Sequence, residues 1–137
     1  MILFQNSLVK LDYDPATDIG VIEYPDLHDY LLPEIKHSID LLVDAIRSYD
    51  VKRLVLDGTK TVATVDIEQD RAIATYMTAG LMRTRIQRLA RIQSLNNLVD
   101  IRAQNNEKYV RETQVPPFPI QAFKSRGEAI DWLLERI

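Results

Sequence analysis

Segments with a strand pattern alternate with segments with a helix pattern along most of the chain, and this alternation restricts the fold more than any other feature. The clearest strand is 52–58, whose centre, Leu54-Val55-Leu56, is continuously apolar, as in strands that are covered on both faces. Helical apolar spacing precedes and follows it. Strands that alternate with helices pair in parallel through right-handed crossovers, so the sequence predicts an α/β fold.

Five strands are expected from alternating or continuous apolar residues bounded by turn signals, at 7–13, 19–24, 52–58, 89–95 and 120–123. The first two are separated by the turn-rich Asp14-Pro15-Ala16-Thr17-Asp18, which predicts an antiparallel hairpin. We therefore expect a single α/β domain over 1–137, with a mostly parallel sheet of four to five strands, an N-terminal antiparallel hairpin and about four helices.

The four helices are expected after Pro25, with Pro33 in the first turn, then from Asp66, from Asn96 or Asn97 towards Gln114, and from Ser125 to the end. Asp66 is followed three residues later by Gln69, and Ser125 by Glu128 in the same way. Both spacings are those of a capping residue and its partner at a helix N-terminus.

Composition excludes several classes of protein. The 137 residues are 46% hydrophobic and 27% charged, as in an ordinary globular domain, and there is no cysteine for a disulfide, a thiolate zinc site or a cysteine nucleophile. Residues 1–7 lack the basic and apolar segments of a signal peptide, and no apolar run approaches the roughly 20 residues of a membrane span. We expect a soluble, cytoplasmic protein.

Residue types that carry catalysis or bind metals do not gather in a working pattern. Asp12, Asp14 and Asp18 are close in sequence, but the spacing is not that of a calcium loop, which favours a charged hairpin loop. His28 and His37 have no further ligand at zinc spacing. No serine has the Gly-x-Ser-x-Gly context of a hydrolase, and four glycines form no phosphate loop. We expect neither an enzyme, nor a cofactor, nor a metal.

Charge is distributed unevenly. The net charge of −3 argues against binding nucleic acid, yet 1–70 carry 14 acids and 6 bases whereas 71–137 carry 6 acids and 11 bases. The densest basic run comprises Arg83, Arg85, Arg88 and Arg91. It predicts a patch for an anion or an acidic partner; the alternative is an outer face that is solvated, pairs with the acidic first half or lies in a homodimer.

Three features resemble the STAS domains of anti-sigma factor antagonists and the related STAS-like, CRAL-TRIO-like small bacterial proteins. They are the long amphipathic first helix, the strand Arg53-Leu-Val-Leu-Asp57 with its terminal acid, and the closing Phe123-Lys-Ser-Arg-Gly-Glu-Ala-Ile-Asp-Trp-Leu133. The resemblance covers nearly the whole chain and is mainly one of topology.

In signalling members of that family, a serine at the start of the second helix is phosphorylated. The resemblance places the matching position of this chain near Val65-Asp66, where an aspartate cannot accept phosphate but keeps a negative charge at a helix N-terminus. Thr59, Thr61 and Thr64 lie in the same loop as alternative acceptors, although threonines in such loops usually serve turns and caps.

Two functions follow as hypotheses. The first is a non-catalytic regulatory module that binds a protein partner through Asp57, Gly58, Thr59, Thr61, Thr64 and Asp66, because open α/β folds place their sites at the carboxyl edge of the sheet. The second is a carrier of a lipid or other small apolar molecule, as the resemblance implies, in a cleft lined by Met77, Gly80, Leu81 and Met82.

Overall fold

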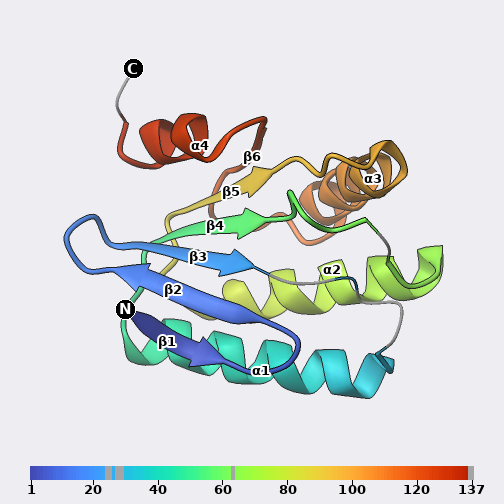
Figure 1. Ribbon diagram of the computed structural model, residues 1–137, viewed down its shortest axis with the longest axis horizontal. Helices are drawn as coiled ribbons and strands as arrows, with labels where there is room; N and C mark the ends of the chain where they lie inside the picture. Colours follow the sequence, from blue (N-terminus) through green and yellow to red (C-terminus); the bar gives the residue numbers. More distant parts are fainter. Residues whose placement is uncertain (24–25, 27–29, 63, 136–137) are drawn as a thin grey trace.

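The computed structural model describes residues 1–23, 26, 30–62 and 64–135. Within them, six strands form one sheet in the order β1-β2-β3-β4-β5-β6 (Figure 1). Strands β1 (Ile2–Gln5), β2 (Lys10–Asp14) and β3 (Ile19–Glu23) pair antiparallel, whereas β3, β4 (Arg53–Asp57), β5 (Arg88–Ile92) and β6 (Ile120–Phe123) pair in parallel. The predicted α/β fold with an antiparallel N-terminal hairpin is confirmed.

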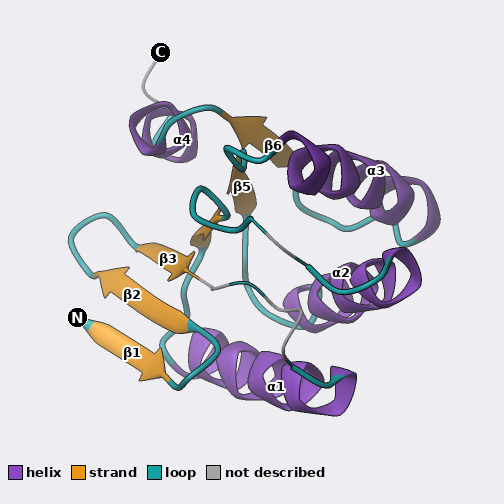
Figure 2. Ribbon diagram, turned by 45° about the vertical axis from the view of Figure 1, so that its right-hand side comes forward, coloured by secondary structure: helices purple, strands orange, loops and turns teal. Residues whose placement is uncertain are grey.

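Three helices connect the parallel strands, and a fourth follows them. They are α1 (Leu32–Ser48), α2 (Ile67–Leu81), α3 (Asn97–Thr113) and α4 (Arg126–Leu133). Because the strands follow one another in sequence order, right-handed crossovers carry α1, α2 and α3 to the same face of the sheet. Helix α4 alone packs on the opposite face (Figure 2).

Strand β1 was not expected from the sequence. It forms because the amide side chain of Asn6 turns the chain: its Oδ1 accepts hydrogen bonds from the backbone N–H groups of Leu8 and Val9, each at 2.9 Å. Because of this turn, the second strand begins at Lys10, and Ile2–Gln5 pair with it as a separate strand. Residue 24, the predicted end of the second strand, Pro25 and the last two residues of the predicted final helix, 136–137, lie outside the described residues.

The predicted helix caps are confirmed. Oδ1 of Asp66 accepts the N–H of Gln69 at 2.9 Å, and Oγ of Ser125 accepts the N–H of Glu128 at 3.2 Å. Of the two asparagines predicted as the cap of α3, Asn96 has this role, with its Oδ1 3.1 Å from the N–H of Val99. Pro33 lies in the first turn of α1, as predicted.

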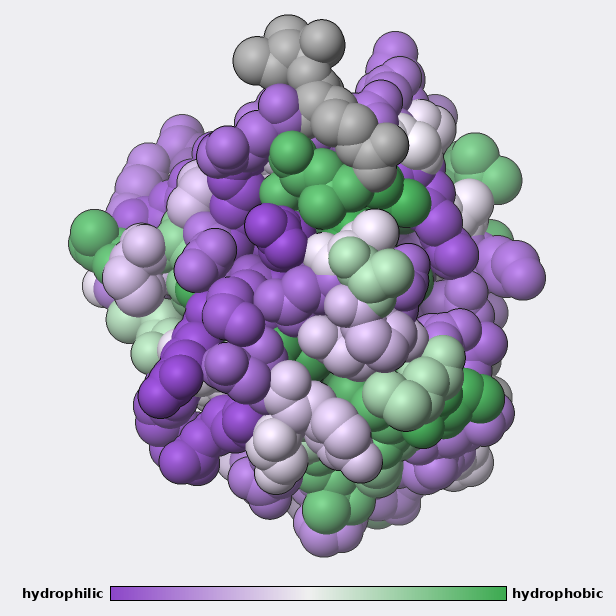
Figure 3. Space-filling model, turned by 90° about the vertical axis from the view of Figure 1, so that its left-hand side faces the viewer, coloured by the Kyte–Doolittle hydropathy of each residue, from purple (hydrophilic) through white to green (hydrophobic). Residues whose placement is uncertain are grey.

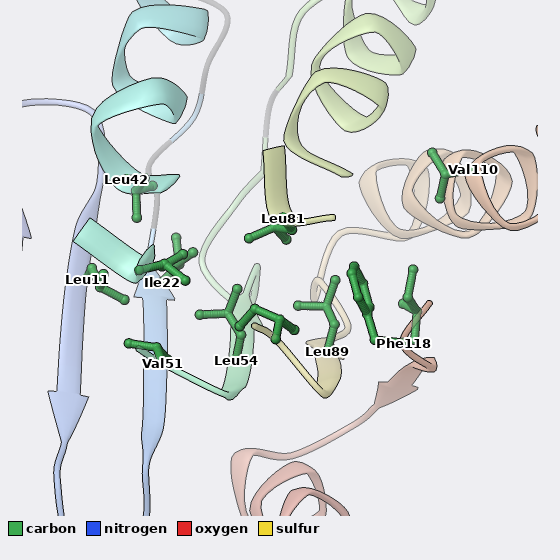
Figure 4. Close-up of a cluster of buried hydrophobic side chains, with 12 residues drawn as sticks. Leu11, Ile22, Leu42, Val51, Leu54, Leu81, Leu89, Val110 and Phe118 are labelled. Carbon is green, nitrogen blue, oxygen red and sulfur yellow. The ribbon is translucent and has the colours of Figure 1, made fainter. Parts of the chain in front are cut away.

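The main core lies between the sheet and helices α1, α2 and α3. Figure 4 shows side chains from the strands meeting Leu42 of α1, Leu81 of α2 and Val110 of α3. A smaller cluster on the opposite face joins Val55 and Ala90 to α4. Strand β4 is thus covered on both faces, which explains its continuous apolar centre.

Gly80 sets the distance between α1 and α2. A Cβ atom at this position would lie 2.8 Å from Cγ2 of Val43 on α1, which is closer than two carbon atoms pack. Gly80 therefore lies in the contact between α1 and α2, and it does not line the cleft predicted from the sequence.

Within the described residues, none of the helices combines the length and the apolar character that crossing a bilayer requires.

We predict that Gly80→Leu destabilises the protein by about 1–3 kcal/mol, because the larger side chain forces α1 and α2 apart. Leucine is the better helix former, so a loss of stability must come from the clash with Val43. Denaturant unfolding measures the effect, with Ala79→Leu as the control, since Ala79 is exposed in the same helix turn. Equal effects of the two variants would contradict this account.

Candidate functional site: a cavity between the sheet and three helices

A cavity of about 190 Å³ lies between the sheet and helices α1, α2 and α3. Its wall is mainly apolar and draws on all three helices, for example on Ile39 of α1, Met77 of α2 and Val99 of α3. A small group of polar residues interrupts this wall: Ser38, Thr61, Thr64, Asp70, Thr78, Arg91, Asn106 and Glu107. An apolar cavity with a few convergent polar groups is the usual form of a small-molecule site.

Three neighbouring strands supply one row of the cavity wall. Ile22 of β3 is in register with Leu56 of β4, and Leu56 is in register with Arg91 of β5. All three side chains line the cavity. An arginine therefore occupies a position that the pattern of the sheet would give to an apolar residue.

Arg91 is held there by two carboxylates of α3. Its Nη1 lies 2.9 Å from Oδ1 of Asp100, and its Nε lies 3.4 Å from Oε1 of Glu107. The three side chains are 11%, 13% and 14% exposed, respectively. Nη2 of Arg91 is buried and has no hydrogen-bond partner in the described part of the chain. A buried charge of this kind requires its partners.

Asn106 of α3 is another polar residue of the cavity wall. It is 8% exposed, and its Oδ1 accepts a hydrogen bond of 3.5 Å from Nε of Arg71. The guanidinium of Arg71 also lies over the ring of Tyr109, 4.3 Å from the centroid. These contacts tie α2 to α3 and fix the orientation of the Asn106 amide.

Asp70 of α2 contributes a carboxyl group to the cavity wall. Burial raises the pKa of this carboxyl above its usual value of 3.8, and the charge of Arg102 and a hydrogen bond with Thr64 counteract the shift only in part. Nη1 of Arg102 donates to the carbonyl of Val65 at 2.7 Å, which keeps the guanidinium beside this end of α2.

The predicted regulatory loop divides between the two faces of the sheet. Thr61 and Thr64 line the cavity. Asp57, in contrast, accepts hydrogen bonds from the N–H and the hydroxyl of Thr59, at 3.0 and 2.6 Å, and lies 2.5 Å from Nη2 of Arg126 at the start of α4. Its carboxylate therefore fastens the end of β4 to α4.

These contacts also shift the ionisation of Asp57. Burial by itself raises the pKa of the Asp57 carboxyl, but the hydrogen bonds from Thr59 and Arg126 outweigh it and hold the pKa below 3.8. Because the folded-state pKa is lowered, this group stabilises the fold above that usual value and loses the contribution as the pH falls below it.

The other two residues of the predicted loop have structural roles. Gly58 is buried, and it does not adopt the left-handed conformation that a sharp turn at glycine would use. Its carbonyl accepts the N–H of Thr61 at 3.1 Å. Asp66 is exposed and is the cap of α2, which places its negative charge at the helix N-terminus as the sequence predicted.

The four arginines of the predicted basic patch do not lie together. Arg83 and Arg85 are exposed in the loop before β5, near Asp50. Figure 3 shows one face of the molecule, on which hydrophilic and hydrophobic residues are mixed. Arg88 lies on the α4 face, where it contacts Glu135 and the ring of Trp132. Arg91 points to the opposite face, into the cavity wall.

The predicted cleft residues are also divided. Met77 lines the cavity, whereas Leu81 is fully buried in the main core and Met82 packs against that core.

The three acids of the N-terminal hairpin each contact a different group. Asp12 pairs with the N-terminal amine, Asp14 accepts the N–H of Ala16, and Asp18 contacts Lys52.

Sequence reasoning missed the inward position of Arg91, although two signals were present. Period-two alternation places Arg91 on the same face of β5 as the buried Leu89. Asp100 and Glu107 are seven residues apart, so they share one face of α3 two turns apart.

Of the two histidines, His37 is exposed on α1, whereas His28 lies outside the described residues.

Comparison of the chain with protein-family models, with curated proteins and with solved structures gave no match. The STAS-like resemblance therefore stays a prediction that rests on the residues quoted for it.

We predict that Arg91→Met destabilises the protein by about 3 kcal/mol or more, because the buried Asp100 loses its ion pair and Glu107 keeps only the one with Arg111. Adding Asp100→Asn and Glu107→Gln removes those charges and restores part of the loss. Chemical unfolding compares the variants, with Arg85→Met as a control whose side chain is 81% exposed. If Arg91→Met alone is as stable as Arg85→Met, the ion pairs do not have the structural role assigned to them.

Proposed function

We propose that this protein is a non-catalytic binding module that holds a small, mainly apolar molecule in the cavity between the sheet and helices α1, α2 and α3. The observation that carries the proposal is the cavity itself, a mainly apolar space of about 190 Å³ with a few polar residues in its wall. A cavity left empty forfeits contacts on every side, so an occupant that fills it gains them.

Binding is favoured over catalysis because two of the three charged residues in the cavity wall, Arg91 and Glu107, are paired with each other. Arg91 is paired with Asp100 and Glu107, and Glu107 also lies 3.0 Å from Nη2 of Arg111. Groups paired in this way are poorly placed to exchange protons with a substrate, since a change of charge would break an ion pair with little solvent around it.

We predict that protein purified without denaturation carries a bound small molecule, which native mass spectrometry detects as added mass. Ala103→Phe fills the cavity from α3, where Ala103 forms part of its wall, and is expected to abolish that mass. Asn105→Phe is the matched control, because Asn105 is exposed in the same turn.

The decisive measurement is the difference in bound mass between Ala103→Phe and Asn105→Phe. Bound mass that survives Ala103→Phe would place the molecule elsewhere. If the wild-type protein carries no mass, and if small apolar compounds raise its melting temperature no more than that of Ala103→Phe, the proposed function is wrong.

A second candidate function is the STAS-like regulatory module that binds a protein partner, and an exposed apolar patch favours it. Val62, Leu95 and Leu98 are each more than half exposed. Hydrogen bonds from Ser94 Oγ to the carbonyl of Thr61, at 2.6 Å, and from Asn96 Nδ2 to that of Val62, at 3.3 Å, join the loops that carry them. Exposed apolar patches of this kind often mark protein contacts.

We predict that Val62→Asp together with Leu98→Asp weakens binding of such a partner at least tenfold, because charge is buried without a counterpart. The readout is a quantitative pull-down of one partner identified with the wild-type protein, and Leu41→Asp on α1 is the control. Asp66→Lys would be a poor test, since it removes the cap of α2 and costs about 1 kcal/mol of stability. Binding unchanged by the double variant excludes the patch.

A further inference from the structure

The size of the cavity restricts its occupant, if the proposed function holds. An apolar cavity of about 150 Å³ accommodates benzene, and the present one measures about 190 Å³. One ring with a short substituent fits this space, whereas typical sites for drug-sized ligands begin near 300 Å³. The structure as it stands therefore favours a single-ring compound over the lipid chain that the CRAL-TRIO-like resemblance implies.

Two hydrogen-bond donors at the cavity wall lack acceptors. The Nδ2 group of Asn106 donates to no acceptor in the described part of the chain, since the only hydrogen bond of this side chain is made by Oδ1. Nη2 of Arg91 is likewise without a partner. It is covered, so an acceptor reaches it only when the neighbouring side chains shift. Of these two donors only Nη2 of Arg91 is fully covered, whereas an acceptor on the ligand can reach Nδ2 of Asn106 directly. A hydrogen bond to this amide would be stabilising.

The ligand is expected to be neutral. The carboxylate of Glu107 lies beside both Arg91 and Arg111. Asp70 forms no ion pair among the described residues, and burial raises the pKa of its carboxyl, which favours the neutral form. An anion would meet these two carboxyl groups, and a cation would meet the guanidinium of Arg91. Transfer of a charged ligand out of water would then be uncompensated.

We propose that the cavity binds a neutral single-ring compound with one carbonyl or hydroxyl oxygen, which accepts a hydrogen bond from Nδ2 of Asn106. The ring occupies the apolar part between Met77 and Leu56, and the oxygen faces the polar part of the wall. This assignment rests on the proposed function and adds the chemical class of the ligand.

Four probes of similar size test this class: acetophenone, ethylbenzene, benzoate and benzylamine. Titration of ¹⁵N-labelled wild-type protein, followed by NMR at pH 7, gives their affinities. We expect acetophenone to bind at least tenfold more tightly than ethylbenzene and the two ions to bind more weakly than either. Asn106→Leu is expected to lower the affinity for acetophenone to that for ethylbenzene and to leave the latter within twofold.

The outcomes separate the two proposals. If ethylbenzene binds as tightly as acetophenone, or if either ion binds best, the cavity is used but the assigned ligand class is wrong. If none of the four probes shifts the resonances of cavity residues, and Ala103→Phe does not change the bound mass seen by native mass spectrometry, the proposed function fails as well. The wild-type comparison stands even if Asn106→Leu does not fold.

Discussion

Strand β4 pairs in parallel with both of its neighbours, and this pairing decides where most other elements lie. Because β3, β4, β5 and β6 follow one another in sequence order, each connection makes the same right-handed turn, and α1, α2 and α3 come to one face. The opposite face is left to α4, which Arg53 and Asp57 of β4 help to hold through the carbonyl of Leu133 and the guanidinium of Arg126.

The one-sided arrangement of three helices also creates the candidate site. Helix α2 contacts both α1 and α3, and the three helices together cover one face of the sheet. On that face the row Ile22, Leu56 and Arg91 lines the cavity. An arginine in this row needs carboxylates within reach, and α3 supplies them, so that polar groups enter a wall that is otherwise apolar.

The loop between β4 and α2 connects the two candidate functions. Thr61 and Thr64 face the cavity, whereas Val62, between them, is exposed beside Leu95 and Leu98. A molecule in the cavity and a protein on the patch would therefore contact the same short segment from opposite sides. The backbone of this loop is hydrogen-bonded to Ser94 and Asn96, just before α3.

The sequence by itself determined the alternation of elements, the hairpin and the caps at Asp66 and Ser125, because these depend on local spacing and on backbone groups a few residues apart. It also determined the apolar centre of β4. Strand β1 was missed, since the turn at Asn6 that creates it is made by one side chain and not by a pattern.

Only the tertiary structure decided which polar residues belong together. Arg88 and Arg91 are three residues apart in the sequence, yet the pleat of β5 sends one to Trp132 and the other to Asp100 and Glu107. Likewise Asp57, the last residue of β4, contacts Arg126 of α4, whereas Thr61 in the loop that follows lines the cavity on the opposite face. Local spacing gives the face of a strand or helix, whereas the partner across that face is set by chain segments far away in sequence, which meet only when the sheet and its helices pack.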